Sequence, residues 1–333
     1  MKKKYQNVFF IFGIVVLGIM VTQLDFEEVW KGLQHAGYWF FAVVFLWAFL
    51  YIFNTASWYI IIKSQEKEED KRTIPFWLLY KLSVSGFALN YATPGGLMGG
   101  EPYRIMELTP RIGVERATSS VLLFVMTHIF SHFWFWLLSI PLFLLTQPVN
   151  FFMGTMLSVI GLVCILAIWF FLSGYKKGLA VRSMNLLGRI PGVRNWAKKY
   201  ITENKEQLEN IDKQIAALHN QDKKTFISIV LIELACRICS ALEIFFILLV
   251  LFPSVNYLNC ILIISFTTLF ANLLFFMPLQ LGGREGGFLM SVSGLGLTTS
   301  AGIFVALIVR IRELIWTAIG LLFIKISKTK KEE

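Results

Sequence analysis

The sequence predicts an all-α, polytopic membrane protein, built as an inverted repeat with two re-entrant hairpins of broken helix. Three observations support this prediction. Hydrophobic residues make up 56% of the 333 residues and charged residues only 16%, with a mean hydropathy of +0.65, whereas a soluble domain has about 25% charged residues. Long runs without charge recur along the chain, and a proline- and glycine-rich segment occurs twice among them. We therefore expect a single transmembrane domain over residues 1–333.

Runs of apolar residues place the membrane crossings, because a helix needs about 20 residues to cross the hydrocarbon core. The expected crossings are residues 8–24, 38–62, 121–145, 151–172, 226–252 and 301–324. Residues 174–225 form the one long polar segment, and we interpret it as a cytoplasmic amphipathic linker between the two halves.

The placement of basic residues predicts the orientation. Lysine and arginine gather at residues 2–4, 63–72, 174–225 and 325–331, which can all lie on one side of the membrane. Because cytoplasmic loops carry an excess of these residues, we expect a multi-pass protein of the cell membrane with both termini in the cytoplasm. The net charge of +10 is explained in this way and does not indicate a nucleic-acid partner.

Two related segments interrupt the apolar sequence. The first is NYATPGGLMGGEPYR at residues 90–104, and the second is NLLFFMPLQLGGREGG at residues 272–287. Each has an Asn, then a Pro, then two closely spaced Gly pairs, with a Glu seven residues after the Pro. Clustered glycine and proline cannot continue a regular helix, and hydrocarbon tolerates broken backbone only where protein or water surrounds it. Both segments should therefore line an interior site.

The flanks of these segments predict two hairpins that enter from opposite faces. Residues 76–89 are too short to cross comfortably, and basic residues on both sides of the first segment place both ends of its hairpin in the cytoplasm. Residues 258–277 and 288–299 flank the second segment, and they must enter from outside if the lysine-rich C-terminus is to be cytoplasmic. Broken segments in opposite orientation are typical of inverted-repeat transporters, which bind substrate at the repeat interface.

Charged residues inside apolar segments are the candidates for binding. Such side chains are costly in a bilayer and normally face a cavity or a partner. Arginine binds phosphate through two donors, and helix N-termini offer N–H groups to anions. The predicted substrate-binding residues are Asn90, Pro94, Gly95, Gly96, Gly99, Gly100, Glu101, Arg104, Arg237, Asn272, Pro278, Gly282, Gly283, Arg284, Glu285, Arg310 and Glu313. The glutamates could balance the arginines, meet a cationic head group or take up protons.

Other interpretations of these residues stay open. Glu233 and Arg237 lie one helical turn apart and could simply neutralise each other, and the Gly-x-x-x-Gly spacings also favour close helix packing. His128 and His132, also one turn apart, are expected to be a packed or cavity-lining pair, because two histidines without a nearby carboxylate are a weak metal signal. We expect no metal site, no cofactor and no catalytic residue.

The motif residues resemble those of a known family. Thr93-Pro94-Gly95-Gly96, Gly99-Gly100-Glu101 and Arg104, followed by Pro278 and Gly282-Gly283-Arg284-Glu285-Gly286, resemble the lysylphosphatidylglycerol synthase transmembrane-region family, also called flippase-like domain proteins. In the best-known members this region looks like a flippase that moves aminoacylated phosphatidylglycerol to the outer leaflet, and a separate soluble domain makes that lipid. The present chain ends at Glu333, and we expect it to lack the aminoacyl-transfer domain.

The resemblance and the motifs together favour a non-enzymatic lipid transporter. Its expected partner is an anionic or zwitterionic, phosphate-bearing membrane lipid, with aminoacylated and polyprenyl lipids among the options, and a homo-oligomer is left open. One alternative is a membrane glycosyl- or phospho-transferase acting on a polyprenyl-phosphate lipid, although the sequence has no Asp-x-Asp motif and no polar domain for a nucleotide sugar. The other alternative is an assembly or regulatory protein whose glycine blocks are packing surfaces.

Overall fold

The computed structural model describes residues 26–65, 74–92, 99–177, 223–273 and 283–329, together with single positions at 11, 15, 188, 189, 194, 201, 202, 205, 206, 209 and 212. All regular structure in these residues is helical. The helices are α2 (Phe26–Ala36), α3 (Tyr38–Ser64), α4 (Phe76–Ala92), α5 (Gly100–Ile112), α6 (Val114–Thr146), α7 (Phe151–Lys177), α11 (Lys223–Leu248), α12 (Tyr257–Leu273), α13 (Gly283–Gly294) and α14 (Thr299–Thr329).

Some predictions fall outside the described residues. They are the first crossing at 8–24 apart from positions 11 and 15, most of the linker at 174–225, and the site residues Pro94, Gly95, Gly96, Pro278 and Gly282. The predicted division of the chain at the linker therefore stays a prediction.

Helices α3, α4, α7, α11 and α12 lie close to the predicted segments, whereas α2 was not predicted as a helix and α13 begins at Gly283, five residues before the predicted start at residue 288. Among the described helices, α3, α6 and residues 151–173 of α7 are long and apolar enough to cross a membrane. Helices α11 and α14 have 26 and 31 residues and are also long enough, but they carry charges within their apolar sequence. Helix α6 begins at Val114, earlier than predicted, because Gly113 adopts a φ of 81° and turns the chain directly out of α5.

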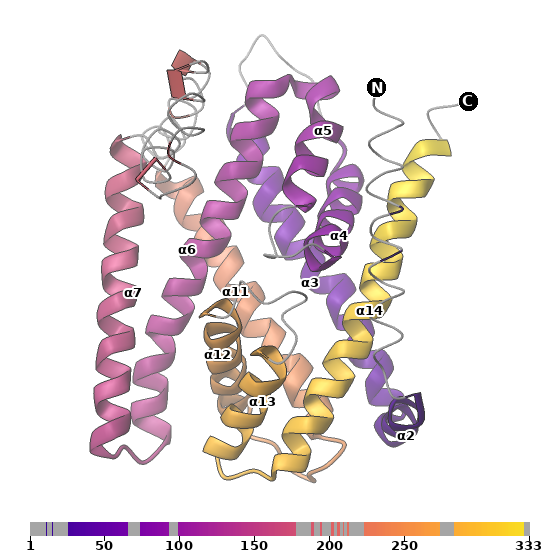
Figure 1. Ribbon diagram of the computed structural model, residues 1–333, viewed down its shortest axis with the longest axis vertical. Helices are drawn as coiled ribbons and strands as arrows, with labels where there is room; N and C mark the ends of the chain where they lie inside the picture. Colours follow the sequence, from indigo (N-terminus) through magenta and orange to yellow (C-terminus); the bar gives the residue numbers. More distant parts are fainter. Residues whose placement is uncertain are drawn as a thin grey trace.

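Two pairs of short helices reach the middle of the molecule from opposite ends (Figure 1). Helices α4 and α5 occupy the upper half of the view and α12 and α13 the lower half, whereas α3, α6, α7, α11 and α14 extend through both halves. Helix α14 packs along α4 and α13, and α6 packs along α5 and α12. The two short pairs thus lie in opposite halves of the molecule, and both pack against α6 and α14.

Buried apolar residues form two large cores with charged residues between them. Trp58, Leu82 and Phe124 belong to the core around α4 and α5, and Ile263 and Val305 belong to the core around α12 and α13. Along α11, Glu233 and Arg237 fall between Ile229 of the first core and Ile244 of the second. Along α14, Arg310, Arg312 and Glu313 fall between Val305 and Leu321. The fold therefore places a charged layer at mid-height.

Candidate functional site

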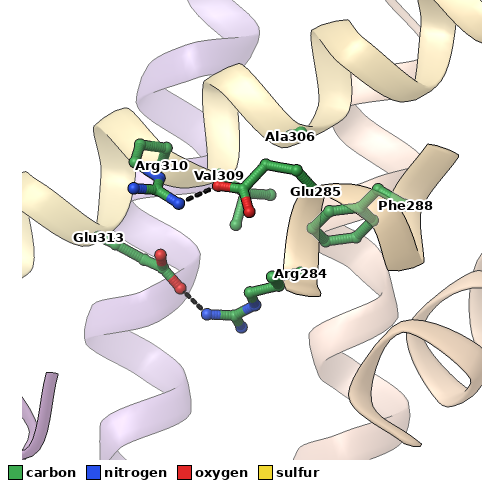
Figure 2. A pocket seen from close by; sticks show the side chains of 7 residues that line it. All are labelled: Arg284, Glu285, Phe288, Ala306, Val309, Arg310 and Glu313. Carbon is green, nitrogen blue, oxygen red and sulfur yellow. Dashed lines mark hydrogen bonds and ion pairs between the residues drawn. The ribbon is translucent and has the colours of Figure 1, made fainter. Parts of the chain in front are cut away.

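The first turn of α13 and the middle of α14 form a cluster of ion pairs. Arg284 of α13 pairs with Glu313 of α14, and Arg310 of α14 pairs with Glu285 of α13. Figure 2 shows the four side chains reaching toward one another across the gap between the two helices. The two pairs are crossed, so each helix gives one arginine and one glutamate. We call these four residues the α13–α14 cluster.

The α13–α14 cluster lines a small pocket that is partly open. Phe288, Ala306 and Val309 complete its walls, and the cavity volume is about 10 Å³. The side chains of Arg284 and Glu285 are 24% and 32% exposed, whereas that of Glu313 is only 2% exposed. A cavity of this size holds about one water molecule, so a larger group can enter only if the ion pairs of the cluster open.

A third ion pair lies next to the cluster and is completely buried. Arg312 of α14 donates to both carboxylate oxygens of Glu243 on α11, over 2.7 and 2.9 Å. The guanidinium carbon of Arg312 also lies 3.9 Å from the ring centre of Trp47 on α3, which favours a cation–π contact. Nη1 of Arg312 is 3.8 Å from Glu313, so the pair adjoins the cluster directly. Its burial and two-pronged geometry indicate that it holds α11, α14 and α3 together.

The charges of these three pairs balance. Within the described residues, Arg284, Arg310 and Arg312 face Glu243, Glu285 and Glu313, giving three positive and three negative side chains. A bare anion bound here would leave a net negative charge in a region of low dielectric, which is costly. A ligand with both a phosphate and a cationic group would keep the balance, so the arrangement can accommodate a zwitterion with little change in net charge.

The residues of the first glycine-rich segment lock α4 to α5. Asn90 accepts a hydrogen bond from the backbone N–H of Gly100 over 2.8 Å and donates to Glu101 over 2.9 Å. Arg104 donates to Glu101 and to the carbonyl oxygens of Leu82 and Ser83 on α4. All three guanidinium nitrogens of Arg104 are thus engaged by the protein, so the predicted binding of a head-group anion by Arg104 would require these bonds to rearrange.

Gly100 is placed where no larger residue fits. A Cβ atom there would lie 2.3 Å from the carbonyl oxygen of Gly86 and 2.7 Å from Oδ1 of Asn90, far inside van der Waals contact. Gly99, just before α5, is buried as well. The closest neighbour of Gly100 is therefore α4, which supports the packing interpretation of this glycine, and its predicted contact with a head group stays a prediction.

Tyr91 connects the first helix pair to the α13–α14 cluster. This residue lies near the end of α4, and its hydroxyl is close enough to Glu313, Arg310 and Arg284 to interact with them electrostatically. The hydroxyl is buried and lies beside the Glu313 carboxylate. Tyr91 is not among the residues predicted from the sequence, although its position directly after Asn90 is the signal that could have suggested it.

A second polar cluster joins α6 to α11. Nδ1 of His128 lies 2.9 Å from Oε2 of Glu233, and Nη1 of Arg237 lies 2.8 Å from Nε2 of His132. Arg237 also donates to the hydroxyl of Ser131 and to the carbonyl oxygen of His128. Glu233 and Arg237 therefore each contact α6, so they do more than neutralise each other, which was one of the two interpretations left open.

The remaining predicted residues lie apart from these clusters or serve packing. Asn272 is exposed and donates to the carbonyl oxygen of Thr268 on its own helix, so it does not repeat the bonds of Asn90. Gly283 begins α13, directly before the cluster. Among the described residues no group of three or more His, Cys, Asp or Glu side chains could hold a metal ion.

Comparison with known proteins identifies a family for most of the chain. The family model described as the lysylphosphatidylglycerol synthase TM region matches residues 8–320. The match spans every described helix except the end of α14, and thus includes both glycine-rich segments and the α13–α14 cluster. Neither the comparison with curated proteins nor the comparison with solved structures gave a match.

Proposed function

The chain belongs to the lysylphosphatidylglycerol synthase transmembrane-region family, a family of membrane domains, and from this premise we propose that it moves a phosphate-bearing lipid head group between the two leaflets of a cell membrane. The lipid tails stay in the bilayer while the head group passes through the interior of the protein. The proposal involves no covalent step, so no catalytic residue is assigned.

Charge at the two ends of the molecule supports an orientation for this transport. Lys63 and Arg111 lie in the last turns of α3 and α5, and Lys325 lies near the end of α14. These three helices end on the side of the molecule where α5 meets α6 (Figure 1). The turns at the opposite end, residues 147–150, 249–256 and 295–298, contain no charged residue. Because basic residues are retained on the cytoplasmic side, the end with the α5–α6 connection faces the cytoplasm in our proposal.

In this orientation the two short helix pairs are re-entrant hairpins related by an inverted repeat. The pair α4 and α5 enters from the cytoplasm, and the pair α12 and α13 enters from outside. The N-termini of α5 and α13 both lie toward the middle of the molecule (Figure 1). Helix N-termini carry partial positive charge and attract anionic groups, and inverted-repeat transporters bind substrates where such half-helices meet.

The α13–α14 cluster is the head-group site in this proposal, and the observation that carries it is its two crossed ion pairs, in which Arg284 and Glu285 are partly exposed. The phosphate of the lipid takes the place of Glu313 beside Arg284, or of Glu285 beside Arg310. A cationic group on the same head then meets the released carboxylate. Each protein ion pair is thereby exchanged for two protein–lipid pairs, so no charge is left uncompensated while the head group is inside. This exchange favours a zwitterionic head group over a purely anionic one.

The test is lipid movement in reconstituted vesicles. Purified protein is inserted into vesicles that contain lipids with a fluorescent head group, and an impermeant quencher reports how fast the labelled head groups exchange between leaflets. We expect Arg284→Gln to slow this exchange by at least about tenfold, because a hydrogen bond to a charged group contributes roughly 1.5–3 kcal/mol.

The matched control is Arg111→Gln, which removes the same charge from an exposed position at the end of α5. This variant should move lipid as fast as the unmodified protein. If Arg284→Gln folds normally and also moves lipid at the unmodified rate, the α13–α14 cluster is not the head-group site.

A further inference from the structure

Two histidines at the contact between α6 and α11 have partners of opposite charge. His128 and His132 lie one turn apart on α6, with ring centres 5.3 Å apart. His128 faces the carboxylate of Glu233, whereas His132 faces the guanidinium of Arg237. The two imidazoles therefore meet partners of opposite charge.

The partners decide which histidine can take up a proton. Arginine can only donate hydrogen bonds, so Nε2 of His132 must accept one from Arg237 and cannot carry a hydrogen. His132 is thereby held neutral. An ionised carboxylate can only accept, so Nδ1 of His128 must donate its hydrogen to Glu233. Protonation of His128 at Nε2 leaves that bond intact and strengthens it, because both partners then carry charge.

Access to the two members of the His128–Glu233 pair is also unequal. The side chain of His128 is 40% exposed, and none of the described residues bonds its Nε2 atom. The side chain of Glu233 is only 1% exposed. Nε2 of His128 is therefore the atom of the pair at which a proton can bind and leave, while Nδ1 holds the buried carboxylate at the middle of α6 and α11.

The charged surroundings of the pair come from several helices. Helix α11 supplies Arg237 and the thiol of Cys236. Helix α6 supplies the neutral His132, and α5 supplies Arg104, whose guanidinium stacks on Phe124 next to His128. Helix α3 supplies the uncharged hydroxyl of Ser57 beside Glu233. Among the described residues, Glu233 is thus the only acid that faces His128.

We propose that His128 and Glu233 form a proton-binding site whose occupancy couples lipid movement to a proton gradient. This inference rests on the proposed transport function. A proton from the accessible side adds to Nε2 of His128 and forms an imidazolium paired with the Glu233 carboxylate. The same proton later leaves from Nε2, and no other bond is made or broken. The charge of the group formed by His128, Glu233 and Arg237 thus changes from zero to +1 and back.

Helix α11 connects this site to the α13–α14 cluster. Glu233 lies ten residues before Glu243 on α11, which corresponds to about 15 Å along a helix. Glu243 holds Arg312, and Arg312 adjoins Glu313 of the cluster. A displacement of α11 that follows the charge change at His128 therefore acts directly on the helix that carries half of the head-group site.

The proton site can be tested without any transport. The chain has four histidines, so protein labelled with ¹⁵N-histidine gives few ring signals by NMR in lipid nanodiscs. His128→Asn identifies the His128 signal and keeps an amide N–H for Glu233. We expect the His128 signal to change from neutral to protonated as the pH is lowered from about 8 to about 4, and the His132 signal to stay neutral. A His128 signal that never changes, or a His132 signal that titrates instead, overturns the site.

Coupling is tested in the vesicle assay with and without a pH gradient. The gradient should change the rate of lipid movement at least about fivefold for the unmodified protein and for His35→Asn, an exposed histidine on α2. The rate for His128→Asn should be the same with and without the gradient. An unmodified rate that ignores the gradient, or a His128→Asn rate that follows it, contradicts the coupling. If the unmodified protein moves no lipid at all, the transport function fails, and the NMR titration still decides the proton site.

Discussion

At the scale of single residues, the buried pair of Arg312 and Glu243 determines whether the charged layer can exist. Both side chains are removed from solvent, and each depends on the other to compensate its charge. Burying a paired charge contributes little net stability, but removing one partner leaves the other unpaired and costs about 3–5 kcal/mol. The pair therefore adds little net stability, but the loss of either partner alone destabilises the fold.

This asymmetry gives a prediction for thermal unfolding in detergent. Arg312→Gln or Glu243→Gln alone should lower the free energy of unfolding by about 3–5 kcal/mol, whereas the double variant should be less destabilised than either single one. The exposed pair of Lys31 and Glu27 on α2 is the control, since Lys31→Gln should change the midpoint very little. A double variant that simply adds the two single losses would show that the buried pair is not coupled.

The charged residues themselves could be predicted from sequence, but their partners could not. Arginine and glutamate inside apolar segments indicate an interior site because a bilayer tolerates them only there. Glu233 and Arg237 are one turn apart in sequence, yet each contacts α6 in the structure. Arg312 and Glu243 are 69 positions apart, and only the packing of α11 against α14 brings them together.

At the scale of helices, the two broken elements could be predicted most reliably. Proline and glycine clusters cannot continue a helix, so the chain had to change direction after α4 and after α12. The boundaries of α3 and α4 agree with the expected segments to within three residues. Sequence missed the early start of α6, because a glycine with positive φ can occur within a polar stretch without any apolar signal to mark it.

The re-entrant arrangement of α12 and α13 can be tested by labelling. Ser254 precedes α12 and Ser300 lies at the start of α14, and both are exposed. If the helix pair enters and leaves on the same face, cysteines at these two positions should react with an impermeant maleimide from the outside. A cysteine at the exposed Glu115, at the start of α6, should react only from the cytoplasmic side.

The four native cysteines are buried or half-buried, so the unmodified protein provides the background for this measurement. Labelling of Ser254→Cys and Ser300→Cys from opposite sides would show that α12 and α13 together cross the membrane. That result would contradict both the re-entrant hairpin and the inverted repeat.

At the scale of the whole molecule, two apolar cores enclose a charged layer, and this division explains how a membrane protein can hold so many ions. Inside a bilayer the hydrophobic effect does not drive helices together, and close packing and interhelical bonds do so instead. The close approach of α4 to α14 at Gly320 and the bond from Ser85 to the Gly320 carbonyl oxygen are examples. Which helices pack against each other could not be predicted from sequence, because a helix face in lipid is apolar whether it contacts lipid or another helix.

The central claim is that a lipid head group occupies the space lined by the α13–α14 cluster. Photo-crosslinking in nanodiscs tests it most directly, with one lipid that carries a reactive group beside its phosphate and another that carries it at the end of an acyl chain. The head-group probe should label the first turn of α13 and the stretch of α14 around Arg310, and the acyl probe should label the exposed apolar face of α7 around Trp169. Head-group labelling that is confined to α7 and the helix ends would contradict the account.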